Sequence, residues 1–320
     1  MDLFKTALAL SSIPAPSGFE RATVDAIADI ARAYASDMRR TSAGSLLVRR
    51  PGRGRRIMLV THADTCGFLT TFREDSGALR FGTLGPVNVH LALGSPVVST
   101  RGTRGVIGAD DGAEPANLTK TQLYIDAPGA TLSEAFAFAA PGYSENGIAT
   151  APALSMALSA AVLLDVMAEA KTDADVTFVF TAQHMLGARD TAAAAFTAAP
   201  EFAVTIDGIP ACDIPGGNGT VALGGGIVIS HQAGRAIADP ALTNALLRAA
   251  CGTVQHDFAG PAVSDLAAVQ KVGAGIPTAA AGFAVRGSGS LQERAAIADA
   301  KALSHTLQAL LAGDLPSQAL

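Results

Sequence analysis

The chain has 320 residues, of which 49% are hydrophobic and only 16% are charged, and its formal net charge is −5. This length allows one large or two moderate domains, and the low charge content leaves much surface for small apolar side chains or other subunits to cover. The negative balance and the lack of a Lys and Arg cluster beside aromatic residues exclude nucleic acids and anionic membranes as expected partners. The low charge content leads us to expect a homo-oligomer. We expect no membrane span, because no apolar run approaches ~18–20 residues.

Cysteine usage indicates a reducing environment. Cys66, Cys212 and Cys251 are odd in number and widely spaced, so they form neither a disulfide framework nor a Cys-x-x-Cys metal site. The first residues lack the charged and apolar pattern of a signal peptide. We expect a cytoplasmic protein, with Cys66 as a small buried hydrophobe.

The first 66 residues have an α/β pattern. A helix is predicted over residues 1–11 and is stopped by prolines at 14 and 16. Ser17 and Glu20 then have the spacing of a capping box for a helix that continues to about residue 34. Strands at 45–50 and 56–61 flank a Pro-Gly turn and are predicted to form a hairpin.

Residues 67–147 have a different texture, with short β-like pieces between glycine and proline turns. We interpret this region as a small all-β domain inserted into an α/β domain made of residues 1–66 and 148–320. Within the insertion, a helix is predicted at 131–138 because Ser133 and Glu134 lie near its start. The predicted strands are 68–72, 79–81, 96–99, 105–107 and 122–125.

The remainder alternates between helices and strands, which predicts a mostly parallel sheet flanked by helices. Helices are predicted at 153–170, 186–197, 240–250, from 265 and at 293–311. Strands are predicted at 176–181, 202–206, 253–256 and 278–283, with a β pair at 220–222 and 227–230.

The apolar run at 57–60 is followed by His62 and Asp64, which are two positions apart. Such a run is typical of a strand buried on both faces, and the carboxyl end of a parallel strand is where open α/β sheets bind ligands. The alternative is a histidine satisfied by a neighbouring carbonyl, with Asp64 capping a turn. The residues alone leave both interpretations open.

The ordered landmarks resemble the tetrahedral aminopeptidase family of metallopeptidases, which includes glutamyl and deblocking aminopeptidases and was once described as cellulases. The resemblance covers nearly the whole chain. It implies an α/β catalytic domain of the zinc aminopeptidase fold, a β-barrel dimerisation domain, and dimers that often assemble into a dodecamer. It rests on residues 13–20 (IPAPSGFE), 61–64 (THAD), 67–68 (GF), 123–127 (LYIDA), 181–183 (TAQ) and 223–226 (LGGG), with Asp207, Ser264, Asp265, Arg286, Ser290 and Glu293.

The resemblance implies two zinc ions, five ligating side chains and a glutamate as general base for a bridging water. His62 and Asp207 fall on two ligands of the same metal, and Asp64 falls on the carboxylate that orients the histidine. At the remaining ligand positions this chain has Ser155, Met185 and Gly289, and His184 replaces the base. Peptide hydrolysis by the family mechanism is therefore not expected.

Three hypotheses follow from this pattern. The first is a pseudo-peptidase, an assembly whose pocket binds a peptide or small molecule. The second is an active hydrolase or lyase with a rebuilt mononuclear site at His62, His184 and Asp207, since two histidines and a carboxylate suit zinc or iron. The third is an ordinary aminopeptidase whose ligands come from elsewhere. We expect either no metal or one divalent metal, for which zinc is the first candidate. The alternative for His184 is a hydrogen-bonding residue that fills the space left by the missing metal and glutamate.

Overall fold

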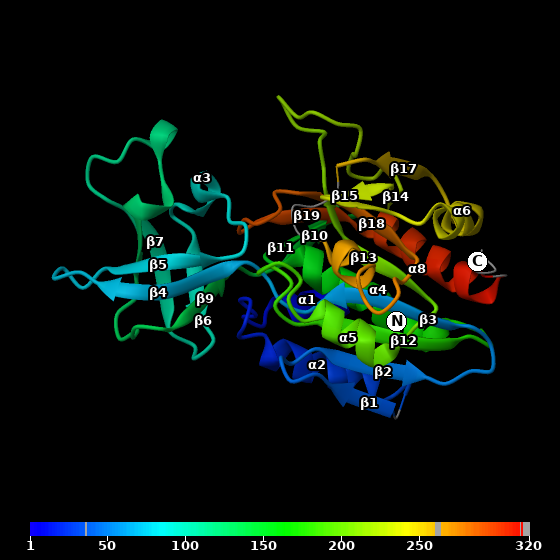
Figure 1. Ribbon diagram of the computed structural model, residues 1–320. Helices are drawn as coiled ribbons and strands as arrows, with labels where there is room; N and C mark the ends of the chain where they lie inside the picture. The colour runs from blue at the N-terminus through cyan, green and yellow to red at the C-terminus, as the bar shows by residue number, and fades with distance from the viewer. Residues whose placement is uncertain (36, 260–263, 314, 316–320) are drawn as a thin grey trace.

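The computed structural model describes residues 1–35, 37–259, 264–313 and 315. Within these residues, a mixed sheet of 11 strands and a separate closed barrel make up the two parts of the molecule (Figure 1). The sheet runs in the order β1 (Asp37–Arg40), β2 (Leu46–Arg50), β12 (Asp175–Thr181), β3 (Arg56–His62), β13 (Phe202–Pro210), β18 (Thr278–Arg286), β19 (Glu293–Ala296), β11 (Ile148–Ala151) and β10 (Tyr143–Glu145). Off this path, β14 (Ile227–Ser230) pairs with β18 and with β17 (Val254–Asp257).

The centre of the sheet is parallel, from β12 through β3 and β13 to β18, and it is covered on both faces. Every residue of β12 is buried, as expected for a strand at the centre of a sheet that is covered on both faces. One face packs against α1 (Leu3–Ser11), α2 (Arg21–Ala31), α4 (Leu154–Glu169), α6 (Pro240–Ala249) and α8 (Ile297–Ala312). The other face packs against α5 (Thr191–Ala198) and α7 (Asp265–Val269). The predicted α/β class is confirmed.

The barrel consists of β4 (Gly67–Arg73), β5 (Leu79–Leu84), β8 (Leu123–Asp126), β7 (Arg104–Ala109), β6 (Pro96–Ser99) and β9 (Ala135–Phe138). Its core is built around Phe68 and Phe136, with Leu79, Ile107 and Ile125 from the surrounding strands. Helix α3 (Val89–Ala92) and the short 3-10 helices η1 (Pro115–Asn117) and η2 (Lys120–Gln122) complete this part, and the two-stranded β15 (Gln232–Ala233) and β16 (Ala236–Ile237) lie outside it. None of the described helices combines the length and apolarity that crossing a membrane requires.

The predicted hairpin between residues 45–50 and 56–61 is wrong. Strand β12 lies between β2 and β3, antiparallel to the first and parallel to the second. The Pro-Gly connection instead passes beside the start of β12, where a Cβ at Gly52 would lie 2.3 Å from the Ala174 carbonyl oxygen. Glycine was thus required for a close approach to another segment, not for a hairpin turn. The predicted strand at 220–222 is also absent.

The predicted helix at 131–138 is wrong as well, because its final residues form β9 of the barrel. A Thr131 to Glu134 spacing is a helix-start signal, and the Glu134 carboxylate does accept from the Thr131 N–H at 2.9 Å. Here the same hydrogen bond closes a turn with Ser133 at φ 60°, and no helix follows.

Glu134 should make the barrel sensitive to acid. Burial opposes ionisation, but the Ser99 and Thr103 hydroxyls and the Thr131 N–H lower the pKa of Glu134 from 4.5 to about 2. The ionised Glu134 then contributes about 2 kcal/mol to the free energy of unfolding. This contribution is fully present above pH 4.5 and is lost as the pH falls toward 2. In urea unfolding, Glu134→Gln should be less stable than the wild type at pH 7, and the gap should narrow in acid. The exposed Asp75→Asn is the matched control, and a gap independent of pH would contradict this assignment.

Three predicted helix starts also need correction. The helix predicted from 186 begins at Thr191, and residues 184–190 contain no helix or strand. The helix predicted from 293 begins at Ile297, because β19 occupies the preceding residues. The capping box of Ser17 and Glu20 does not form, since the Glu20 carboxylate accepts from the distant Gln183 N–H at 2.9 Å.

Candidate metal-binding pocket

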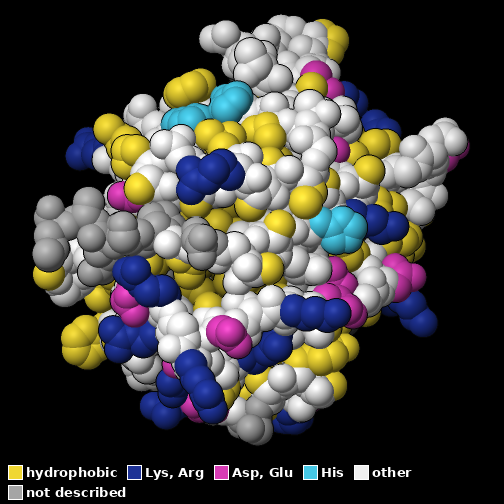
Figure 2. Space-filling view, turned by 90° about the vertical axis from the view of Figure 1, so that its right-hand side faces the viewer, with side chains coloured by type: hydrophobic (Ala, Val, Ile, Leu, Met, Phe, Trp, Pro, Cys, Tyr) yellow, Lys and Arg dark blue, Asp and Glu magenta, His cyan; other side chains and the backbone are white. Residues whose placement is uncertain are grey.

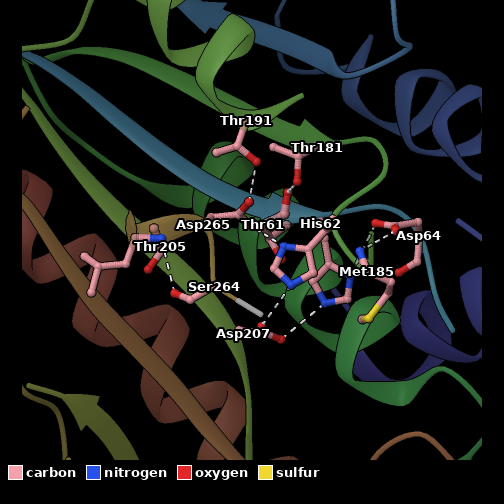
Figure 3. Close-up of polar contacts among 12 residues, drawn as sticks. Thr61, His62, Asp64, Thr181, Met185, Thr191, Thr205, Asp207, Ser264 and Asp265 are labelled. Atoms are coloured by element: carbon pink, nitrogen blue, oxygen red, sulfur yellow. Dashed lines mark hydrogen bonds and ion pairs between the residues drawn. The ribbon is translucent and has the colours of Figure 1, made fainter. Parts of the chain in front are cut away.

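His62 and Asp207 meet at the carboxyl edge of the sheet (Figure 3). His62 ends β3, and Asp207 occupies the adjacent parallel strand β13, so the same edge carries both side chains. The His62 Nε2 atom lies 3.2 Å from Asp207 Oδ1. The His62 side chain is 1% exposed and that of Asp207 18%, so the carboxylate faces the opening.

Asp64 orients His62 through its main chain. The His62 Nδ1 atom lies 2.7 Å from the Asp64 carbonyl oxygen and 3.8 Å from its carboxylate. The carboxylate instead accepts from the Met185 N–H at 2.9 Å. The histidine is thus satisfied by a neighbouring carbonyl at one nitrogen only, while its other nitrogen points to Asp207.

His184 comes from the loop that follows β12 and lies against His62, with ring centroids 4.5 Å apart and planes inclined by 20°. Its Nδ1 atom lies 3.1 Å from Asp265 Oδ2, and its Nε2 atom lies 3.7 Å from Asp207 Oδ2. Asp265 is the first residue of α7 and also accepts from the Thr191 hydroxyl at 2.5 Å. His62 Nδ1 therefore has a hydrogen-bond acceptor, whereas His184 Nδ1 lies at ion-pair distance from Asp265 without hydrogen-bond geometry. Both Nε2 atoms lie near the Asp207 carboxylate.

The charges of this cluster compensate one another. Burial disfavours the imidazolium of His184, but Asp265 and then Asp207 outweigh it and raise its pKa to about 10. Burial is likewise opposed at His62, whose pKa is raised chiefly by Asp207. For Asp207 and Asp265 burial favours the neutral acid, yet the two imidazoles hold both pKa values below the ordinary one.

The cluster fits one divalent cation. Ligand atoms of His62, His184 and Asp207 lie within 4.8 Å of one another, and no other group of three or more potential ligands occurs in the described part of the chain. With an oxygen near Nδ1 of each histidine, both Nε2 atoms remain for a metal. Two histidines and a carboxylate are a set that zinc and iron accept.

The positions expected to hold a second cation do not fit one. The Ser155 hydroxyl donates to Asp207 Oδ1 at 2.9 Å and accepts from the Gly208 N–H at 3.1 Å. Gly289 has no side chain, and Met185 contributes its N–H to Asp64. No carboxylate or imidazole stands at any of these three positions.

A cavity of about 380 Å³ opens over the cluster. Glu293 lies in its wall, but both oxygens accept backbone N–H groups, from Ser155 at 2.8 Å and Gly289 at 2.9 Å. Burial raises the pKa of Glu293. The described lining contains no Lys or Arg, and its apolar members are Cys66, Pro86, Leu91, Ala153, Met156, Met185, Pro210, Ala211, Ile214 and Val285.

The family model of the M42 glutamyl aminopeptidases matches residues 44–305. The chain belongs to the M42 family. A protein of Acetivibrio thermocellus described as a candidate aminopeptidase is 26% identical over 93% of this chain and 95% of its own length. Both sequence comparisons thus confirm the resemblance to the tetrahedral aminopeptidase family.

Solved structures share the fold of this M42 protein. A TET aminopeptidase from a marine sediment thaumarchaeon has a TM-score of 0.91 at 20% identity, with 97% of each chain covered. An aminopeptidase from Desulfurococcus kamchatkensis has a TM-score of 0.89 at 23% identity, over 97% of this chain and 94% of that one. The TET1 peptidase of Pyrococcus horikoshii, which can assemble into a tetrahedron or a large octahedral shell, has a TM-score of 0.86 at 24% identity, over 97% and 99%.

Two residues that support this M42 pocket had no predicted role in it. Asp265 contacts His184, and Glu20 contacts the loop that carries it. Both lie within motifs that support the family resemblance, but their partners are far away in sequence, so no local spacing pointed to them. Cys66 is buried, and burial raises the pKa of its thiol to about 12, which disfavours a nucleophilic thiolate. His231 and His256 pair with each other at 2.8 Å outside the cavity lining.

Proposed function

We propose that this M42 protein is a pseudo-peptidase, a cytoplasmic homo-oligomer whose pocket holds one divalent cation, zinc first, and a peptide or small molecule. The observation that carries the proposal concerns the three positions at which a second cation would bind. Ser155, Met185 and Gly289 occupy them and offer no carboxylate or imidazole. The first half retains His62 and Asp207, at 3.2 Å.

Dinuclear hydrolysis relies on two close cations, a bridging carboxylate and a base that takes a proton from water. In this pocket Ser155 is hydrogen-bonded to Asp207 and cannot bridge two cations as a carboxylate does. The carboxylates of Asp64 and Glu293 already accept backbone N–H groups. Loss of general-base catalysis alone typically costs about 10² to 10⁴ in rate, so we expect no peptidase turnover by the dinuclear mechanism.

A second candidate is an active hydrolase with a mononuclear site. The convergence of His62, His184 and Asp207 within 4.8 Å favours it. A cation bound there would supply Lewis-acid polarisation of a carbonyl or of water. The protein's part would be to fix the imidazoles, His62 by the Asp64 carbonyl and His184 by Asp265.

The proposed partners are other copies of this chain and a small ligand. Exposed apolar side chains on the barrel, Phe72, Val106 and Leu132, are 57%, 48% and 50% exposed and support assembly through this part. The face in Figure 2 has Lys and Arg side chains interspersed with Asp and Glu, which does not favour a polyanionic partner there.

Metal analysis combined with a peptidase assay tests the proposal. After loading with zinc or cobalt and dialysis, the wild type should hold one ion per chain, and light scattering of the same sample gives the assembly size. Aminoacyl chromogenic substrates should give no turnover above a His62→Ala control. Two ions per chain with metal-dependent turnover would overturn the proposal. One ion with turnover that disappears in both His62→Ala and His184→Ala would instead establish the mononuclear hydrolase.

A further inference from the structure

The loop that carries His184 has little structure of its own. Residues 182–190 contain no helix or strand, and Gln183, Gly187 and Ala188 have positive φ values of 56°, 100° and 51°. Inside the loop, the His184 carbonyl accepts from the N–H groups of Gly187 at 2.9 Å and Ala188 at 2.8 Å. Yet the His184 side chain is only 2% exposed and is fixed against His62. Such a loop requires contacts from outside to keep one conformation.

Two carboxylates supply these contacts, one on each side of His184. Glu20 Oε1 accepts from the Gln183 N–H at 2.9 Å, and Asp64 Oδ2 accepts from the Met185 N–H at 2.9 Å. The Ser45 hydroxyl accepts from the Ala182 N–H at 2.9 Å. The main chain is thus held immediately before and after the histidine.

Glu20 is an unusual residue for a purely structural position. It lies at the start of α2, is 4% exposed, and its second oxygen is buried without a hydrogen-bond partner in the described part of the protein. A buried carboxylate with an unsatisfied oxygen is costly. Burial and the neighbouring Asp64 raise the pKa of Glu20 to about 7, which agrees with this crowded setting.

We propose that Glu20 is a positioning residue that holds the Gln183 peptide and thereby fixes the His184 imidazole for its ligand. This inference rests on the proposed function, because the ligand is the cation of the His62, His184 and Asp207 site. It links the first turn of α2 to the pocket over 163 residues of sequence. The contact to the cation is indirect, so Glu20 changes the geometry of the site and not its ligand set.

Variants of Glu20 separate positioning from folding. Glu20→Gln keeps an oxygen that accepts from the Gln183 N–H, whereas Glu20→Leu removes it and Glu20→Asp shortens the side chain by one methylene. We expect Glu20→Leu to weaken zinc and cobalt binding about 10- to 100-fold, the usual effect of losing a residue that supports a ligand. Glu20→Asp should change it in the same direction, and Glu20→Gln should retain the wild-type affinity.

Hydrogen exchange of the metal-free protein gives a readout that is independent of the proposed function. Amides of residues 182–187 should exchange faster in Glu20→Leu and Glu20→Asp than in the wild type, and normally in Glu20→Gln. Asp165→Leu removes another buried carboxylate, bonded to Ser304, and controls for general destabilisation.

The outcomes distinguish the two claims. If the wild type binds no cation, the proposed function fails, and exchange alone decides the role of Glu20. If Glu20→Leu folds and neither exchange nor affinity changes, the positioning role is wrong. It is also wrong if Asp165→Leu accelerates exchange of the same loop equally. Should Glu20→Leu not fold, Glu20→Asp decides by the same measurements.

Discussion

Asp207→Asn should remove most of the cation affinity of the pocket. Asp207 is the shared centre of the cluster, because Oδ1 contacts His62 and Oδ2 faces His184. Loss of one partner from a buried charged group costs about 3–5 kcal/mol, or about 10² to 10⁴ in affinity. The amide keeps the shape of the side chain, so the Ser155 and Gly208 contacts to Oδ1 can persist. Competition with a chromogenic chelator measures the change.

Asp64→Asn is the matched control for this prediction. Asp64 is a buried carboxylate only two residues after His62, but it accepts from the Met185 N–H and does not face the cation site. Its loss should weaken binding by about 10- to 100-fold at most. Equal losses in both variants would show that Asp207 acts through the fold, and unchanged binding in Asp207→Asn would place the cation elsewhere.

The central fold could be predicted from sequence because its signals are local. A continuous apolar run ending in His62 indicated a buried parallel strand, and β3 has that character. Strand partners are not local, and this is why the Pro-Gly segment at 51–54 was mistaken for a hairpin. Its glycines serve a close approach to the segment before β12. Similarly, Ser133 and Glu134 indicated the start of a helix, but the hydrogen bond between Thr131 and Glu134 closes a turn before a strand.

The pocket could be predicted only in part for the same reason. The resemblance placed His62 and Asp207 on two ligands of one metal and left His184 open between a ligand and a hydrogen-bonding replacement. The structure places ligand atoms of all three within 4.8 Å of one another. The residues that fix these side chains, Asp265 and Glu20, act across 81 and 163 residues of sequence. No periodicity or spacing reports such contacts, because they depend on which strand and helix ends meet at the sheet edge.

Two of the three positions at which the second cation was expected to bind, Met185 and Gly289, line the cavity and also contact the segment that follows β5, which sequence could not reveal. A Cβ at Gly85, whose φ is +87°, would lie 2.6 Å from the Met185 Cβ. A Cβ at Gly289, whose φ is +74°, would lie 2.7 Å from the Pro86 carbonyl oxygen. The Asn88 N–H also donates to the Gly289 carbonyl at 3.3 Å. The segment that follows β5 thus lies against two of the three positions and leaves little space for a Cβ atom at position 289.

Gly289→His should therefore destabilise the protein without restoring a second cation. A non-glycine residue in the left-handed region costs roughly 1–2 kcal/mol, and the clash with Pro86 adds about 1–3 kcal/mol. We expect a loss of roughly 2–5 kcal/mol in urea unfolding. Gly129→Ala is the matched control, because Gly129 has φ +86° and a Cβ there meets nothing within 4 Å. Gly129→Ala should lose only the roughly 1–2 kcal/mol that the left-handed backbone costs. Gly289→Ala should show the same loss if Pro86 can move aside.

Metal analysis of Gly289→His then separates packing from ligand chemistry. If the second cation is missing merely because a ligand was lost, a histidine at 289 should raise the content above that of the wild type. If the barrel segment occupies the space, the content should stay at the wild-type value while stability falls, because the imidazole must displace Pro86 before it reaches the cavity. A second ion per chain with unchanged stability would show that the Pro86 segment does not block a side chain at position 289. The dinuclear aminopeptidase mechanism would then have to be considered again.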